Sequence, residues 1–550
     1  MEDPDEVVLG SGYPATPGPA AGARDMLQAA ADLVNPLAAA RELPWLAGEL
    51  LKIAIGRSDL AFEESDPRFR DTTWRDNPAF RGLGLSYRLS EQWADRMVGA
   101  VDGPWERQAR ARYLASIVTG ALSPTNYLIT NPLALKRAFE TGGQSVLRGG
   151  RNMLRDLARG GMPSMVNRKP FPVGEKLACT PGAVVYREDI FELLQYTPTT
   201  PAVRCTPLLM VPPELNRYYV LDLAPGRSMV EYATAQGIQV FMIVWRNPRP
   251  GLGHGRWGID DYVGAQTRAA KVVRKISGSE TVNWLGLCAG GITTALALGY
   301  LAARGDTSAG AATFIVTMLT SDYPNIVGWM AGGGSLAALK QAAAAGRVFP
   351  GRMLRTSFAW LRPNDLVFNY LVSGWLLGED PPAFDVLAWN DDATAMTARL
   401  SAEVSELLVG RKAARPGAVT VLGTPIDLAE VDCDGFYVAG YTDHITPWRA
   451  CYGAAQVLGG RKDMVVVKSG HIQSFVNPAK TAKYGYWDAP PAPDDPDRWL
   501  ATAAGHEGSW WPRWAGWLIS RSGAEKPAHA ELGSRRYPPL GPAPGTYVHQ

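Results

Sequence analysis

A cysteine, an aspartate and a histidine occur along this chain in the order of a nucleophile, an acid and a base. The cysteine, Cys288, lies at the centre of Gly286-Leu287-Cys288-Ala289-Gly290. The Gly-x-Cys-x-Gly spacing is that of a nucleophile elbow, in which a strand turns sharply into a helix. Glycines let such a turn close, and the start of a helix favours a negatively charged sulfur. The pattern predicts a nucleophile at Cys288; its alternative is a buried cysteine in a glycine-rich crossover.

The other two groups follow apolar segments that predict strands. Asp443 comes after the segment 436–439, and His471 comes after the segment 464–467. In a doubly wound sheet the reactive groups lie just beyond the carboxyl ends of the strands. Cys, then Asp, then His is also the chain order of the α/β-hydrolase fold. We therefore predict that His471 transfers protons and that Asp443 orients it.

Attack by the nucleophile on a carbonyl group makes its oxygen negative, and we expect backbone N–H groups near Cys288 to form an oxyanion hole that binds this oxygen. Its two donors would be Ala289, directly after the cysteine, and Leu215, in the loop after the strand expected at 207–211. His444 competes with His471 as the base, but it is adjacent to Asp443, and consecutive side chains cannot easily face each other. We keep His444, with Trp389, as a candidate residue of a substrate pocket or cap. No HExxH or comparable spacing occurs, so no metal site is expected.

The elements that must position these groups form the pattern of an α/β fold. Apolar segments predict strands at 183–186, 191–196, 207–211, 240–245 and 282–286, with helices at 262–276 and 292–303. Alternation of strands and helices indicates a doubly wound, mostly parallel sheet. Residues 281–303 carry no charge and are long enough to span a bilayer. Glycines in the first half of this run favour a buried strand and a buried helix instead.

Composition changes divide the chain into three parts. Residues 1–65 predict a flexible, amphipathic extension, 66–180 a mainly helical N-terminal domain, and 181–550 an α/β-hydrolase catalytic domain. Within the last, the aromatic, glycine- and proline-rich stretch at about 320–400 predicts a cap inserted over the sheet. Two prolines, Pro36 and Pro44, are expected to break the first helical stretch. Four tryptophans between 510 and 517 predict core packing rather than a polymer-binding face.

Charge and cysteine usage exclude several classes of function. The chain has 55 basic and 53 acidic residues, a net charge of +2, which gives no reason to expect a nucleic-acid partner. Its five cysteines lack CxxC spacing and suit a reducing cytoplasm. The acidic first residues lack the basic start and apolar core of a secretion signal.

Motifs from about Asp66 to the C-terminus resemble the polyhydroxyalkanoate synthases, specifically the single-subunit types of classes I and II. The matching motifs include Trp74-Arg75-Asp76-Asn77-Pro78, Ser123-Pro124-Thr125-Asn126, Val244–Pro248, the Cys288 elbow, Arg362-Pro363-Asn364-Asp365, Gly423–Leu428, Asp443–Trp448 and Ser469–Ser474. In this family the catalytic Cys, Asp and His fall on Cys288, Asp443 and His471. The chain departs from the family at Glu214, where Cys or Gln is frequent.

The resemblance implies a reaction and a place of action. It implies that (R)-3-hydroxyacyl-CoA is polymerised into a storage polyester with release of CoA. CoA enters as part of the substrate, so no separate cofactor is implied. The resemblance further implies a homodimer acting on the surface of cytoplasmic polyester granules, where the cap would keep water from the acyl group. Two alternatives stay open: a Cys-dependent hydrolase of esters or thioesters similar to dienelactone hydrolases, and an inactive granule-surface binding protein.

Overall fold

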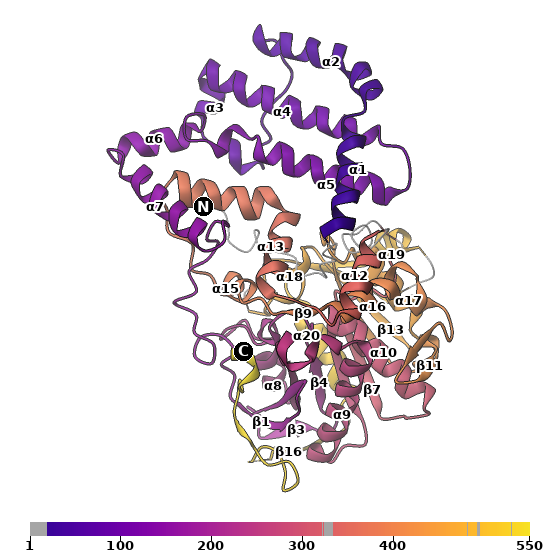
Figure 1. Ribbon diagram of the computed structural model, residues 1–550. Coiled ribbons are helices and arrows are strands. Elements are labelled where there is room, and N and C mark those ends of the chain that lie inside the picture. The colour runs from indigo at the N-terminus through magenta and orange to yellow at the C-terminus, as the bar shows by residue number, and fades with distance from the viewer. Residues whose placement is uncertain (1–18, 322, 324–333, 481, 492–494, 530) are drawn as a thin grey trace. The chain divides into compact units, whose positions relative to one another are not determined.

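The chain divides into two compact units. In the computed structural model, residues 19–321, 323, 334–480, 482–491, 495–529 and 531–550 are described (Figure 1). One unit comprises Pro19–Asn167 with Thr356–Ala383, and the other comprises Arg168–Arg355 with Phe384–Gln550. The first 18 residues of the expected N-terminal extension, and positions 322 and 324–333 of the expected cap, lie outside the described residues.

The first unit is built from helices, which confirms the predicted helical N-terminal region. They are α1 (Pro19–Leu33), α2 (Pro36–Ala54), α3 (Thr73–Asp76), α4 (Pro78–Gly99), α5 (Trp105–Ala121), α6 (Pro132–Glu140) and α7 (Gln144–Ala158). Three of these helices begin in the same way, with an Asn-Pro pair at 35, 77 and 131. Each asparagine side chain accepts from one or two backbone N–H groups of the first turn, and the proline supplies a suitable φ at the first helical position.

One helix boundary differs from its prediction. Pro36 separates α1 from α2 as expected, but Pro44 lies inside α2, which continues to Ala54. The prediction of a break at Pro44 was therefore wrong. A proline inside a helix removes one hydrogen bond and bends the chain. Here the leucines and alanines on both sides of Pro44 are good helix formers, and the helix continues through it.

The second unit is built around an eleven-stranded sheet. Its strands in spatial order are β15 (Ala504–His506), β14 (Tyr486–Ala489), β13 (Lys462–Val467), β12 (Gly435–Gly440), β7 (Ala309–Ile315), β6 (Val282–Leu287), β4 (Leu208–Val211), β5 (Val240–Trp245), β2 (Phe191–Tyr196), β1 (Gly182–Arg187) and β17 (Gly541–Pro542). From β13 to β5 all pairs are parallel, and the outer strands pair antiparallel. The predicted parallel sheet is confirmed. Of its outer strands, β1 and β2 were predicted, whereas β14, β15 and β17 were not.

Helices connect and cover the parallel strands. They include α8 (Met229–Ala235), α9 (Ile259–Ser277), α10 (Ala289–Ala303), α17 (Trp448–Val457) and α18 (His471–Phe475). Figure 1 shows α9 and α10 beside the central strands, and both contact β4 and β6. The uncharged run 281–303 thus forms a buried strand and a buried helix, as predicted. Among the residues described, no helix combines the length and hydropathy that crossing a membrane requires.

The expected cap is divided between the two units. Its described part contains α12 (Gly334–Ala344), α13 (Gly351–Leu361), α14 (Asn369–Leu371), α15 (Asp385–Asp391) and the start of α16 (Ala398–Val409). Residues 356–383 belong to the helical unit, whereas α12, α15 and α16 belong to the sheet unit. The extent of the cap as a single insertion stays a prediction.

The C-terminal part returns to the sheet after α19 (Pro496–Thr502). Helix α20 (Trp511–Ile519) packs on β12, where Trp510 and Trp517 contact the ring of Phe436, and on β7, where the Trp514 indole N–H donates to Thr313 Oγ1 at 3.0 Å. All four tryptophans between 510 and 517 are buried, which confirms the prediction that they pack in the core. The tail then adds β16 (Glu525–Pro527) to β3 (Ala202–Arg204) and β17 to β1.

Candidate active site

The turn between β6 and α10 places Cys288 in a strained backbone conformation. Its φ is 52° and its ψ is −114°, a region that residues with a side chain rarely adopt, and it forms the N-cap of α10. The flanking glycines are needed for space. A Cβ on Gly286 would lie 2.6 Å from the Cα of Gly291, and a Cβ on Gly290 would lie 2.5 Å from the carbonyl oxygen of Val211. This geometry explains the Gly-x-Cys-x-Gly spacing.

Asp443 and His471 meet beyond the ends of two adjacent parallel strands. Asp443 follows β12, and His471 is the first residue of α18, which follows β13. The imidazole Nδ1 lies 2.5 Å from Asp443 Oδ2. Strand pairing in register brings the two loops together, with α17 filling the connection between them. The expected placement at the strand ends is therefore observed, although residues 443 and 471 are 28 positions apart.

A threonine that the sequence analysis did not single out completes this pair. Thr446 Oγ1 donates to Asp443 Oδ2 at 2.7 Å and lies 3.2 Å from His471 Nδ1. Asp443 Oδ1 also accepts the backbone N–H groups of Ile445 and Thr446. The carboxylate is thus fixed by three contacts within its own turn, in addition to the contact with His471. An Asp followed three residues later by Thr is a common local turn pattern, and that spacing was the available signal.

The pair is linked to the elbow cysteine. With Nδ1 held by Asp443, the other ring nitrogen of His471, Nε2, is buried and has no hydrogen-bond partner among the described residues. It is the nitrogen left to interact with the Cys288 thiol, which is close enough to shift the pKa of the imidazole. Burial acts to lower the pKa of His471, but Asp443 and Cys288 outweigh it and raise that pKa to about 10. Burial acts to raise the pKa of Asp443, and the imidazole and Thr446 lower it overall. Cys288, Asp443 and His471 are 3, 5 and 2% exposed, so bulk water barely reaches them.

Two tryptophans hold the short helix that carries His471. The Trp510 indole N–H donates to the Ser474 carbonyl oxygen at 2.7 Å, and the Trp511 indole N–H donates to the Phe475 carbonyl oxygen at 3.1 Å. These carbonyls are at the C-terminal end of α18, where a five-residue helix has no partners of its own for them. The tryptophan cluster therefore supports the site as well as the core.

The two N–H groups expected to form an oxyanion hole belong to two segments that are in close contact, the elbow and the loop after β4. Ala289 is the first residue of α10, where an N–H has no partner within the helix. Leu215 is buried in the loop after β4, and the carbonyl oxygens of Val211, at the end of β4, and of Pro212, at the start of the loop, approach Gly290. The elbow and the loop are thus packed together. Which N–H groups bind an oxyanion stays a prediction.

The two candidate pocket residues occupy different surroundings. Trp389, on α15, is buried, and its indole N–H donates to the Arg217 carbonyl oxygen at 2.8 Å, so it packs on the loop that also contains Leu215. His444 is half-buried beside Asp443, where its charge contributes to lowering the pKa of that carboxyl group. Their roles toward a substrate stay predictions.

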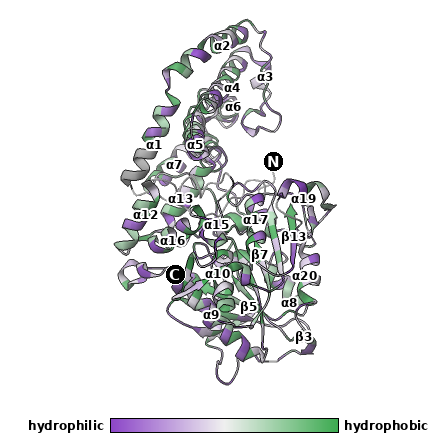
Figure 2. Cartoon of the chain, turned by 90° about the vertical axis from the view of Figure 1, so that its right-hand side faces the viewer, coloured by the Kyte–Doolittle hydropathy of each residue, from purple (hydrophilic) through white to green (hydrophobic). Residues whose placement is uncertain are grey.

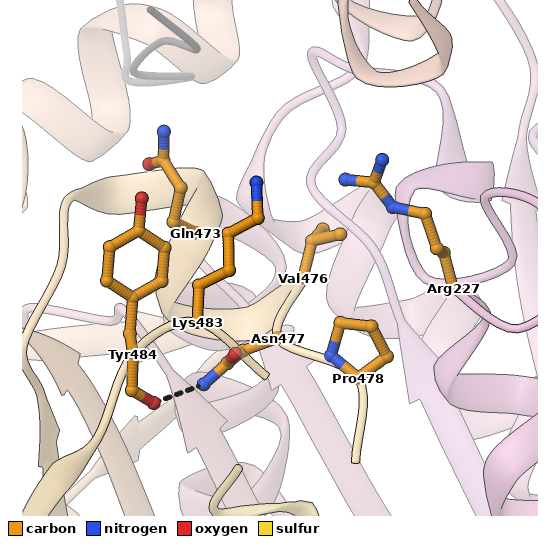
Figure 3. Close-up of a pocket in the computed structure, with 7 residues that line it drawn as sticks. All are labelled: Arg227, Gln473, Val476, Asn477, Pro478, Lys483 and Tyr484. Carbon is orange, nitrogen blue, oxygen red and sulfur yellow. Dashed lines mark hydrogen bonds between the residues drawn. The ribbon is translucent and has the colours of Figure 1, made fainter. Parts of the chain in front are cut away.

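A cavity of about 220 Å³ opens beside α18. It is lined by Arg227, Gln473, Val476, Asn477, Pro478, Lys483 and Tyr484. Figure 3 shows the guanidinium of Arg227 and the ammonium of Lys483 on facing sides of it, with Val476 between them. Gln473 is only two residues from His471. The cavity therefore offers two cations to a ligand next to the histidine, a feature that the sequence analysis did not identify.

Comparisons with known proteins cover nearly the whole chain. Residues 65–233 match the family described as poly-beta-hydroxybutyrate polymerase (PhaC) N-terminus, and residues 225–478 match the alpha/beta hydrolase fold. Poly(3-hydroxyalkanoate) polymerase 2 of Ectopseudomonas oleovorans is 42% identical, over 94% of this chain and 92% of its own. Poly(3-hydroxyalkanoate) polymerase 1 of the same organism is 40% identical, over 96% and 95%. The poly(3-hydroxyalkanoate) polymerase subunit PhaC of Cupriavidus necator is 38% identical, over 90% and 85%.

Proposed function

Because this chain belongs to the poly(3-hydroxyalkanoate) polymerase family and is therefore an acyltransferase that makes polyester, we propose that it polymerises (R)-3-hydroxyacyl-CoA through an acyl thioester on Cys288. The observation that carries this proposal is the buried arrangement of Cys288, His471 and Asp443 at the elbow. It supplies a sulfur nucleophile, a proton carrier and an acid that orients the proton carrier.

In the first half of the reaction the acyl group moves from CoA to the enzyme. The Cys288 thiolate attacks the thioester carbonyl carbon, and the bond from that carbon to the CoA sulfur breaks. His471, as imidazolium, gives its proton to the departing CoA thiolate. The carbonyl oxygen is negative in between, and backbone N–H groups of Ala289 and Leu215 would stabilise it. One thioester replaces another, so the acyl-enzyme is not an energetic trap.

In the second half an ester bond forms. The 3-hydroxyl group of another acyl unit attacks the carbonyl carbon on Cys288, and neutral His471 takes the hydroxyl proton. The carbon–sulfur bond breaks, and the starting pair of thiolate and imidazolium returns. Water would end the chain at this stage. The low exposure of the three side chains supports transfer to a hydroxyl group over hydrolysis.

The cavity beside α18 suits the charged part of such a substrate. CoA carries phosphate groups, and Arg227 and Lys483 present two cations to the cavity. Arg227 also contacts Asp385 Oδ1 at 3.0 Å, which fixes the direction of its guanidinium group. Guanidinium and ammonium groups are the usual partners of phosphate oxygens. We place a CoA phosphate between these two side chains in the proposed complex.

Exposed apolar side chains on the helical unit support action at a polyester surface. Phe139 on α6 and Leu147 on α7 are 90 and 74% exposed, and Leu154 and Leu157 on α7 are exposed as well. Large exposed apolar groups in one region are typical of interaction surfaces. Figure 2 shows that α1 and α2 also mix hydrophobic with hydrophilic residues. The same proposal includes attachment to cytoplasmic polyester granules and action there as a homodimer.

The test follows both products from (R)-3-hydroxyacyl-CoA. CoA release should be accompanied by insoluble, high-mass polyester. Cys288→Ala should release no CoA while keeping the wild-type fold, and Cys288→Ser should lose most of the rate. Cys205→Ala is the matched control and should keep the rate. Release of CoA with equal amounts of free hydroxy acid, and no polymer, would instead make the protein a hydrolase.

A further inference from the structure

A buried acid lies in the loop that follows β4. Glu214 is 3% exposed and directly precedes Leu215. Its Oε1 accepts a hydrogen bond from Thr293 Oγ1 at 2.6 Å. Its other oxygen, Oε2, is buried and has no hydrogen-bond partner on any other residue of the described chain. A buried carboxylate oxygen without a hydrogen bond raises the free energy of the ionised form, because burial removes its hydration and no protein group replaces it.

Thr293 belongs to a buried chain of hydrogen bonds between two helices. Gln266 on α9 donates from Nε2 to Thr293 Oγ1 at 2.7 Å, and Thr294 Oγ1 donates to Gln266 Oε1 at 3.2 Å. Gln266, Thr293 and Thr294 are completely buried. Thr293 Oγ1 also lies 3.2 Å from the carbonyl oxygen of Gly290 in the first turn of α10. Glu214 is thereby joined to the elbow through one hydroxyl group.

Two hydrogen-bond arrangements are available to this contact. With Glu214 ionised, Thr293 gives its single hydroxyl proton to Oε1. With Glu214 neutral and protonated on Oε1, the carboxyl group donates to Thr293, and the threonine proton turns to the Gly290 carbonyl oxygen. The neutral arrangement satisfies every donor and leaves only an acceptor, Oε2, without a partner. The ionised arrangement leaves negative charge on that oxygen.

The charge state of Glu214 changes near neutral pH. Burial raises the pKa of Glu214 to about 7, although hydrogen bonds from Thr293 and from its own backbone act to lower it. Among described residues, the one other titratable side chain that interacts with it is Tyr262 on α9, and no charged group on β4, α9 or α10 contributes. Within the described parts of the chain, no cation contributes to stabilising the ionised form of Glu214.

We propose that Glu214 is a positioning residue for the acyl transfer: its neutral carboxyl group fixes the loop bearing the Leu215 N–H against the elbow through Thr293, and its carboxylate form opposes the negative carbonyl oxygen. The inference rests on the proposed function, because it concerns the oxyanion that forms during attack by Cys288. Glu214 lies next in sequence to one proposed N–H donor, and Gly290 lies next to the other, Ala289. Their connection through Thr293 sets the spacing of the two donors.

The test compares Glu214→Gln with the wild type across pH 6 to 9, with thiol release from (R)-3-hydroxyacyl-CoA as the measurement. An amide reproduces the neutral acid, with a donor toward Thr293 and an acceptor at the position of Oε2, and it cannot ionise. The wild-type kcat should fall about tenfold from pH 6.5 to 8.5. The glutamine variant should match the wild type at pH 6.5 and keep its kcat through the same range.

Variants at Thr293 supply an independent measurement. Thr293→Val removes the hydroxyl link and should lower kcat more than it changes KM, while Thr293→Ser should restore kcat. Thermal unfolding of each variant separates these effects from misfolding. If Glu214→Gln reproduces the wild-type pH profile, or Thr293→Ser is as slow as Thr293→Val, Glu214 has no positioning role. If the wild-type protein releases no thiol from any hydroxyacyl thioester, it is the proposed function that fails.

Discussion

The indole N–H of Trp510 donates a hydrogen bond to the carbonyl oxygen of Ser474, three residues after His471. Ser474 precedes β14 and Trp510 follows β15, the two antiparallel strands at one edge of the sheet. Since α18 has only five residues, its C-terminal carbonyls depend on such outside donors. The orientation of His471 toward Cys288 is therefore tied to the packing of the C-terminal helix.

Trp510→Phe should separate this support from ordinary core packing. Phenylalanine keeps most of the ring but removes the donor, so we expect a loss of about 1 kcal/mol in unfolding free energy and a several-fold lower kcat. Trp514→Phe is the matched control. It removes the indole N–H of Trp514 on α20, which donates to Thr313 on β7 and not to α18. It should cost similar stability and leave kcat close to wild type. Equal kcat values in the two variants would contradict the link to His471.

The two neighbouring histidine candidates can be ranked by substitution. His471→Gln should lower thiol release on the order of 10³-fold or more, because the base and its contact with Asp443 are both lost. His444→Gln should change the rate far less, since it affects the charge near Asp443 but not the Asp443–His471 contact. If the His444 variant released no thiol and the His471 variant kept half of the wild-type rate, the two roles would be reversed.

The cavity beside α18 can be tested with a shortened substrate. Arg227→Gln and Lys483→Gln should each raise KM for (R)-3-hydroxyacyl-CoA about tenfold, since each removes a charge-assisted contact to phosphate. With the corresponding hydroxyacyl-pantetheine, which lacks the nucleotide, their KM values should equal that of the wild type. Arg461→Gln, at a cation with an 89% exposed side chain, is the control. An equal rise for both substrates would exclude phosphate recognition at this cavity.

The interaction of the His471 imidazole with Asp443 and Cys288 predicts that the stability of the fold depends on pH. The pKa of His471 is raised from an ordinary value of 6.5 to about 10 in the folded protein. A raised pKa means that protonation stabilises the fold, fully below pH 6.5 and progressively less as pH rises toward 10. The unfolding free energy of the wild type should thus fall between pH 8 and 10 by more than that of His471→Gln, as measured by urea unfolding. Parallel curves for the two proteins would show that His471 carries no such shift.

The sequence by itself determined the elements whose signals are local. The strand, elbow and helix around Cys288 are specified by contiguous residues, because the glycines that permit the turn are within three positions of the cysteine. Asp443 and His471 could be placed for the same reason, since each directly follows a recognisable apolar strand. Parallel pairing of β12 and β13 then brings the two together without any further information.

Only the tertiary structure decided which distant residues complete the site. The contact of Trp510 with Ser474, that of Thr293 with Glu214 and the two cations of the cavity join segments far apart in sequence, so no local pattern records them. The same holds for the short strands β14, β15 and β17 and for the assignment of 356–383 to the helical unit. A tryptophan-rich helix or a single glutamate has the same sequence wherever it packs. Its burial and its partners, and hence its chemistry, are set by the folded neighbours.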